Sequence, residues 1–117
     1  MSLQLERKQF AFAGHVYTLQ CNMAALEDLQ DAFGGNMDGV RDASVADSSV
    51  TLLSIMLNRW AAKQDWPERW TPEQLKEELS FAMLAELDVL GMLFRSLTVE
   101  PATPATETSP QEDTTKN

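Results

Sequence analysis

Large apolar residues stop at Val99, and this boundary constrains the fold more than any other feature of the sequence. The segment that follows, EPATPATETSPQEDTTKN, has three prolines and no aromatic or large aliphatic residue. It cannot bury enough apolar surface to offset the cost of ordering a backbone, about 1 to 2 kcal/mol per residue. We therefore expect one folded domain over residues 1–98 and a disordered, acidic, Thr- and Pro-rich tail over residues 99–117.

The folded part has the length and the apolar content of one small domain. Hydrophobic residues make up 44% of the chain, which suffices for a single core. No apolar run reaches the roughly 18 residues that a membrane span requires, and the stretch MSLQLERKQF lacks the apolar segment of a secretory signal. We expect a cytoplasmic protein with no membrane association.

The chain is acidic, with 18 Asp and Glu against 9 Lys and Arg and a formal net charge of -9. The tail from Glu100 holds four of the acids and one of the bases, so the folded part is acidic as well. An acidic surface repels phosphate backbones and anionic lipid heads. Nucleic acid is therefore not an expected partner.

Residues 9–20, QFAFAGHVYTLQ, predict a β-hairpin. Aromatic and β-branched residues nearly alternate on both sides of a turn at residues 13–15, where Gly14 can adopt a positive φ. Phe10 and Phe12 share one face of the first strand, as Tyr17 and Leu19 do in the second. Because an isolated hairpin is marginal in water, the rest of the chain must cover that apolar face.

Helical periodicity follows the hairpin. Asn22 is suited to cap a helix over residues 23–33, with an apolar stripe of Leu26, Leu29 and Phe33. Residues 36–47 show no period and are expected to form a loop. A helix over about residues 50–63, capped by Ser48 or Ser49, presents a core stripe made by Leu53, Met56, Leu57 and Trp60.

The C-terminal half predicts two more helices. Thr71, Pro72 and Gln74 form a capping box that starts a short helix ending near Leu79. Ser80 then caps a last helix with one continuous apolar seam, made by Leu84, Leu87, Leu90, Phe94 and Leu97. In that helix Gly91 suggests a close helix crossing, and Met83 and Met92, like Met56 before them, fit the core. The fold class is thus mainly α with a small N-terminal β-hairpin (α+β), a compact domain of about four helices.

No catalytic, cofactor or metal site is predicted. His15 and Cys21 are the single histidine and cysteine, and we interpret them as an exposed turn residue and a structural thiol rather than a nucleophile pair. The segment around Gly39 lacks the carboxylates of a calcium loop at the required positions. Because no nucleotide, metalloprotease or serine-hydrolase motif occurs either, we expect a protein that is not an enzyme.

Three aromatic residues are candidates for partner binding. Tryptophan is enriched at interface hot spots, and Trp66 and Trp70 lie in a proline-containing connector outside any helical stripe. Phe94 and the apolar helix face around it are the third candidate. Trp60 continues the core stripe, and acidic residues interrupt the basic residues near the tryptophans, so single-strand nucleic-acid stacking is disfavoured.

The order of these parts resembles the tail assembly chaperones of long-tailed bacteriophages and the related gene-transfer-agent tail proteins. The resemblance covers about residues 8–98 and consists of a Gly-containing turn, a Tyr-x-Leu strand and an Ala-Leu-x-x-Leu-x-x-x-Phe-Gly helix. The matching residues are Gly14, Tyr17, Leu19, Ala25, Leu26, Leu29, Phe33 and Gly34. The loop over residues 36–47 and the tryptophan-rich connector have no counterpart in the family pattern.

The resemblance implies a role without catalysis in the cytoplasm of a bacterial host. Such a chaperone coats the tape-measure protein before tail-tube subunits polymerise around it, and it is expected to be absent from the mature virion. The tail-tube protein is a second implied partner, and self-association into a homo-oligomer is compatible with this role. An amphipathic helix of the partner would dock on apolar grooves of the domain.

The family also commonly makes a longer product by programmed ribosomal frameshifting. Codons ACA AAA AAC for Thr115, Lys116 and Asn117 would contain the slippery heptamer A AAA AAC, and the tail would then link two domains. Two other classes stay open on the residues alone. One is a structural tail component, such as a tube or terminator subunit, and the other is an acidic regulator or DNA mimic that binds a host protein.

Overall fold

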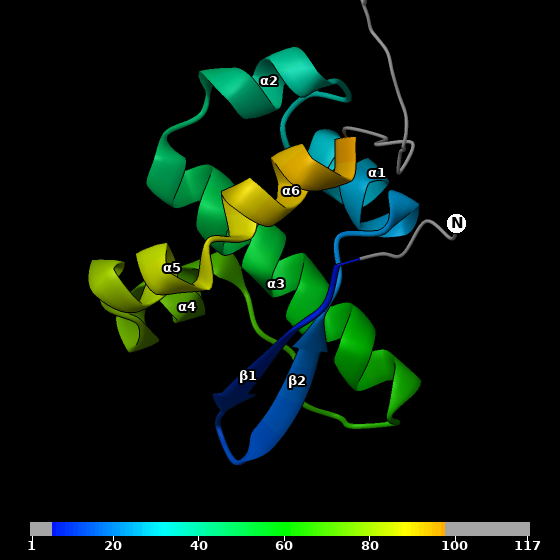
Figure 1. The fold of residues 1–117 in the computed structure, drawn as a ribbon, viewed down its shortest axis with the longest axis vertical. Helices are drawn as coiled ribbons and strands as arrows, with labels where there is room; N and C mark the ends of the chain where they lie inside the picture. Colours follow the sequence, from blue (N-terminus) through cyan, green and yellow to red (C-terminus); the bar gives the residue numbers. More distant parts are fainter. Residues whose placement is uncertain (1–5, 98–117) are drawn as a thin grey trace, which may run out of the picture.

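The structure, a computed structural model, describes residues 6–97 and confirms the predicted fold class (Figure 1). A two-stranded hairpin precedes a helical body. Its elements are β1 (Lys8–Phe12), β2 (His15–Leu19), α1 (Met23–Ala32), α2 (Met37–Asp42), α3 (Val45–Lys63), α4 (Pro72–Glu78), α5 (Phe81–Leu87) and α6 (Val89–Leu97). The predicted disordered tail, residues 99–117, lies outside the described residues.

The hairpin forms where the alternation predicts it. β1 and β2 pair antiparallel from Phe12 opposite His15 to Lys8 opposite Leu19. The two linking residues, Ala13 and Gly14, have φ values of 51° and 84°, which suit the right-handed twist of a tight hairpin turn. His15 is therefore the first residue of β2 rather than a turn residue.

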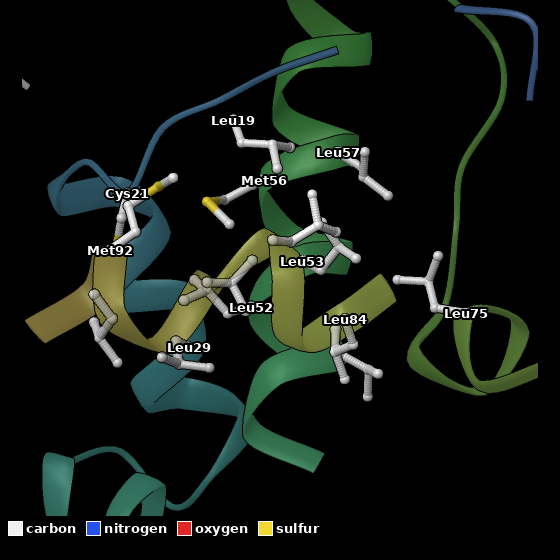
Figure 2. Close-up of a cluster of buried hydrophobic side chains, with 14 of the residues drawn as sticks. Leu19, Cys21, Leu29, Leu52, Leu53, Met56, Leu57, Leu75, Leu84 and Met92 are labelled. Atoms are coloured by element: carbon white, nitrogen blue, oxygen red, sulfur yellow. The ribbon is translucent and has the colours of Figure 1, made fainter. Parts of the chain in front are cut away.

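α3 is the central element of the fold. It runs diagonally through the molecule, and the hairpin, α1, α4, α5 and α6 all pack against it (Figure 1). Its leucines Leu52, Leu53 and Leu57 are completely buried among side chains from the other elements (Figure 2). Fully buried partners come from β2, α1, α4 and α6, namely Tyr17, Leu19, Leu29, Leu75 and Leu93.

The predicted helix caps are confirmed at three helices, including α5, where the Ser80 hydroxyl accepts a hydrogen bond of 3.1 Å from the Met83 amide. The Asn22 side-chain oxygen accepts a hydrogen bond of 2.8 Å from the Ala25 amide at the start of α1. At α4, the Thr71 hydroxyl accepts from the Gln74 amide at 3.1 Å, and the Gln74 side chain accepts from the Thr71 amide at 2.8 Å. These bonds satisfy amides that have no partner within the helix.

The predicted loop over residues 36–47 is wrong. Asn36 caps the short helix α2, and Ser44 caps α3, so α3 starts at Val45 rather than near residue 50. Ser48 is not a cap but is buried, and its hydroxyl donates to the Val40 carbonyl at 3.1 Å. A Cβ at Gly39 would collide with the Phe33 carbonyl, so glycine at this position lets α2 pack against the end of α1.

The last predicted helix is divided in two at Asp88, whose φ of 52° lies in the left-handed region. The break changes the helical phase, so α6 buries Val89, Met92 and Leu93 rather than continuing the seam of Leu84 and Leu87. Gly91 serves no helix crossing, because the Asp88 carboxylate occupies the space beside it. Phe94 and Leu97 remain 51% and 41% exposed.

Candidate functional site

The connector between α3 and α4, residues 64–71, packs Trp66 against the hairpin. The Trp66 ring stacks on the His15 imidazole with a centroid distance of 3.9 Å and an interplanar angle of 14°. It also meets the edge of the Tyr17 ring at 5.3 Å. Its backbone amide donates to the Ala61 carbonyl at 2.9 Å, which holds the connector against the end of α3.

Trp70 is fixed more extensively. Its backbone amide donates to Asn58 Oδ1 at 2.8 Å, and its carbonyl accepts from Ser54 Oγ at 2.6 Å and from Asn58 Nδ2 at 2.9 Å. The indole Nε1 donates to the Tyr17 hydroxyl at 3.4 Å. The centroids of the Trp70 and Phe12 rings are 4.7 Å apart. The backbone carbonyl and amide of Trp70 therefore form hydrogen bonds with side chains of α3 instead of with water.

The structure brings two of the three predicted partner-binding residues together. Trp66 and Trp70 lie in one aromatic cluster with the hairpin, and both are partly buried against the core. Phe94 lies on α6, away from the connector, and is more exposed than either (Figure 1). The two tryptophans thus hold the hairpin to the connector, and what they leave at the surface is only part of each ring.

His15 and Cys21 do not form a reactive pair. The His15 ring lies against Trp66, and its Nε2 is 3.6 Å from Glu68 Oε1, so the expectation of an exposed turn histidine is wrong. Cys21, beyond the other end of β2, is 3% exposed. Burial raises the pKa of the Cys21 thiol, an effect that a hydrogen bond with Ser96 opposes. A buried neutral thiol is a poor nucleophile.

Trp60 lines a small cleft between the end of β2 and the C-terminal half of α3. The prediction that Trp60 belongs to the core holds only in part, because its side chain packs against the core but is only partly buried. Its indole Nε1 is buried and has no acceptor among the described residues. Arg59 at the same cleft is bound to Asp28, with Nη2 2.7 Å from Oδ2.

Two large apolar residues of α5 are exposed, which the apolar pattern of the sequence does not predict. Phe81 is 66% exposed and Met83 is 44% exposed, so the prediction that Met83 belongs to the core is wrong. At 100° per residue, the exposed arc of α5 runs from Phe81 through Ala85 and Ala82 to Glu86 and Met83. The predicted Ser80 cap sets the start of α5, and the predicted apolar residues Leu84 and Leu87 form the face that the helix buries.

Three exposed carboxylates lie on α5 or just before it in the sequence. Glu77 and Glu78, at the end of α4, precede it along the chain, and Glu86 lies within it. All three are exposed, and no ion pair involves them in the part of the chain that the structure describes.

The described residues contain no group of three His, Cys, Asp or Glu side chains placed to hold a metal ion. Among the same residues, no helix has the length and hydropathy needed to cross a bilayer. No family model, curated protein or solved structure matches the chain. The large apolar residues that the described domain exposes include Phe81, Met83 and Phe94.

Proposed function

We propose that this protein is a tail assembly chaperone of a long-tailed phage or prophage, which binds the tape-measure protein and keeps it soluble during tail morphogenesis. One observation carries the proposal. The residues that resemble the family motif belong to one packed unit, in which Tyr17, Leu19, Ala25 and Leu29 are all completely buried. In this chain the residues of the motif thus coincide with a hairpin followed directly by a capped helix.

The surface of the domain supports the same role. A tape-measure protein is long, helical and hydrophobic, so a protein that binds it needs apolar contact area and must itself stay in solution. Phe81 and Phe94 supply exposed apolar area on α5 and α6, while the net charge of -9 opposes aggregation of the complex. Modest affinity at many sites allows later displacement by tail-tube subunits.

A ring-forming tube or terminator subunit is less well supported. Such subunits build rings from extended β-sheet, and the described part of this chain has one two-stranded sheet. On the chaperone proposal, the protein acts in the cytoplasm of the bacterial host and does not remain in the virion. A frameshifted longer form, with residues 99–117 as the linker, belongs to the same proposal.

Co-expression with the neighbouring tape-measure gene tests the function. We expect the tape-measure protein to move from the insoluble to the soluble fraction and to co-purify with this chain. A tape-measure protein that stays insoluble and unbound would contradict the proposal. Mass spectrometry of purified particles separates it from the structural alternative, because a chaperone is absent from particles and a tube or terminator subunit is present in stoichiometric amount.

A further inference from the structure

The outer edge of β2 is a row of backbone groups without partners. A two-residue turn joins β1 to β2, so Phe12 and His15 exchange backbone hydrogen bonds, and every second pair after them does the same. Val16 and Thr18 belong to the pairs between, so their amides and carbonyls point away from β1. No hydrogen bond joins these groups to another residue within the range 6–97. The sheet therefore ends at β2 with an edge that can accept a further strand.

The sequence of β2 does not protect this edge. Proteins commonly block an exposed edge strand with charged side chains, a proline or a bulge. β2 reads HVYTL, without Lys, Arg, Asp, Glu or Pro, and it pairs with β1 through five consecutive residue pairs. Val16 and Thr18 are also β-branched, which is the residue type that strands favour. The backbone edge is thus open to another extended chain.

The cleft described above lies beside the same edge. β2 is on the side of the hairpin that faces the C-terminal half of α3, and Thr18 and Gln20 form one wall of the cleft (Figure 1). The other wall, on α3, includes Arg59, Trp60 and Lys63. Arg59 is already in an ion pair, whereas Lys63 is exposed and has none in the part of the chain that the structure describes. A strand added to β2 therefore passes an uncompensated cation.

We propose that β2 binds an extended acidic segment of a partner protein as a third strand of the sheet. The backbone of the segment bonds to Val16 and Thr18, and a Glu or Asp side chain of the segment pairs with Lys63 at the cleft. Main-chain bonds then supply affinity and the carboxylate supplies selectivity, as in other cases of strand addition. This interaction goes beyond the proposed function, which concerns a helical partner, and does not depend on it.

Two other occupants fit the edge less well. β2 of a second copy carries no Glu or Asp to pair with Lys63. Residues 99–117 of this chain hold four acids, but they contain no large apolar residue beyond Val99 whose burial could offset the cost of ordering them. A partner segment in which apolar residues alternate with polar ones around a carboxylate supplies both, because Met56 and Trp60 also line the cleft.

The test is an NMR titration of the full chain with the synthetic peptide Thr-Val-Thr-Glu-Thr-Val-Thr, blocked at both ends. This sequence reads the same in both directions, so it serves for parallel and for antiparallel pairing, and its valines and glutamate share one face. We expect saturable binding, and binding about two- to fivefold weaker when lysine replaces the glutamate. A glutamate peptide that does not bind, or equal binding of the two peptides, overturns the proposal.

Backbone pairing is tested on the peptide itself. N-methylation of alternate amides blocks one edge of a strand and leaves the other edge free. Of the two peptides that can be made in this way, we expect one to bind like the parent and the other to bind about tenfold more weakly or less, because it loses several main-chain bonds. Equal affinities of the two methylated peptides overturn the proposal, since a strand added to β2 uses one edge only.

Hydrogen exchange on the full chain locates the added strand. Saturating peptide should slow exchange of the Val16 and Thr18 amides by about tenfold or more, while the amides of Gln9 and Ala11, on the outer edge of β1, keep their rates. Protection of Gln9 and Ala11 instead would place the strand on β1 and overturn the proposal.

The same measurement without peptide detects the other occupants. Val16 and Thr18 amides that are already protected in a dimeric chain would show that a second copy covers the edge. The same protection in a monomeric chain would assign the edge to residues 99–117. Sedimentation distinguishes these two cases, and either result overturns the proposal.

A pair of variants tests the charge at the cleft. Lys63→Gln should weaken binding of the glutamate peptide by about two- to fivefold and should leave binding of the lysine peptide no weaker. Arg41→Gln removes an exposed cation from α2, which lies far from the hairpin, and is the charge-matched control (Figure 1). If both variants lose affinity equally, net charge rather than the cleft governs binding, and the proposal is overturned.

Discussion

The Arg95 guanidinium holds the Glu6 carboxylate through two hydrogen bonds, Nε to Oε1 at 2.7 Å and Nη2 to Oε2 at 2.8 Å. The same guanidinium reaches Asp88 Oδ2 with Nη1 at 3.3 Å. The hydrogen bond from Arg95 is the main reason why the pKa of Glu6 lies below its ordinary value. One side chain on α6 thus connects the segment before β1 with the break between α5 and α6.

The Glu6 and Arg95 pair predicts a pH-dependent effect of Glu6→Gln. A carboxylate with a lowered folded-state pKa stabilises the fold at any pH above its unfolded value near 4.5, and this contribution is lost as the pH falls through the folded-state value. Because the pair is solvent-exposed, we expect Tm to fall by only a few degrees at pH 7. The difference from the unsubstituted protein should shrink below about pH 4.5 and should also shrink in high salt. A difference that stays constant down to pH 3 would contradict this account.

Asn58 binds the connector through both the oxygen and the nitrogen of its side-chain amide. Different substitutions of Asn58 should therefore destabilise the protein to different extents. Asn58→Ala leaves the Trp70 amide without its acceptor and should destabilise the protein by about 1 to 3 kcal/mol. Asn58→Asp keeps an acceptor for the Trp70 amide, loses the donor to the Trp70 carbonyl and should cost less. Urea denaturation measures both, and near-UV circular dichroism should report loosened tryptophan packing in the alanine variant. Equal costs for the two variants would argue against a role for the Trp70 amide.

The two helical glycines, Gly39 and Gly91, should respond differently to alanine. At Gly39 a Cβ meets the backbone carbonyl of Phe33, which cannot turn away, so Gly39→Ala should cost about 1 to 3 kcal/mol. At Gly91 a Cβ meets the Asp88 carboxylate, which can rotate, and alanine gains about 1 kcal/mol of helix propensity over glycine. We expect Gly91→Ala to lie close to neutral. Thermal unfolding of the two variants side by side checks the contrast, and a larger loss at Gly91 would contradict it.

Lys8 holds the end of α5, so Lys8→Gln should loosen that helix locally. The ammonium group binds two terminal carbonyls, and its loss should lower the local stability of α5 by about 1 kcal/mol. Hydrogen exchange should accelerate for the amides of residues 84–87, while the amides of α3 keep their rates. Lys63→Gln, at the exposed end of α3, is a control of equal charge change. Uniform acceleration across the chain would instead indicate a global effect.

Local chemistry explains which elements could be predicted. Aromatic and β-branched residues nearly alternate along both strands of the hairpin, on either side of a turn that needs positive φ. Asn22 supplies a side-chain acceptor one residue before α1, and Thr71 and Gln74 form a reciprocal cap at α4. Each of these signals acts within a few residues. Tertiary packing does not override them, because the hairpin, α1 and α4 all turn their apolar faces toward α3.

The errors have two physical causes: contacts between residues that the local pattern does not relate, and a backbone conformation that apolar periodicity does not indicate. Gly39 lets α2 pack closely on Phe33. The apolar periodicity of this six-residue segment is too weak to indicate a helix that packs there. The continuous seam predicted for the last helix ignores the left-handed Asp88, a conformation that side chains other than Gly, Asn and Asp rarely adopt. The exposure of Phe81 follows from that break and from the small contact of α5 with α3.

The surroundings of the candidate residues depend on tertiary contacts that sequence patterns do not indicate. Trp66 and Trp70 looked like free connector residues, because sequence alone could not show that Ser54 and Asn58 bind the connector backbone. The predicted seam of the last helix included Phe94, whereas α6 buries Val89, Met92 and Leu93 and leaves Phe94 exposed. Sequence patterns mark apolar residues well, and the packing of neighbouring elements decides which of them reach the surface.

The bond between Glu6 and Arg95 also bears on chain topology. Since it brings the two ends of the described chain together, a flexible linker of about five to eight residues can join residue 97 to residue 6. New ends opened between Gly34 and Gly35, both exposed, would then separate α1 from α2 without cutting any element. The domain is thus suited to circular permutation and to insertion as a unit into a loop of another protein.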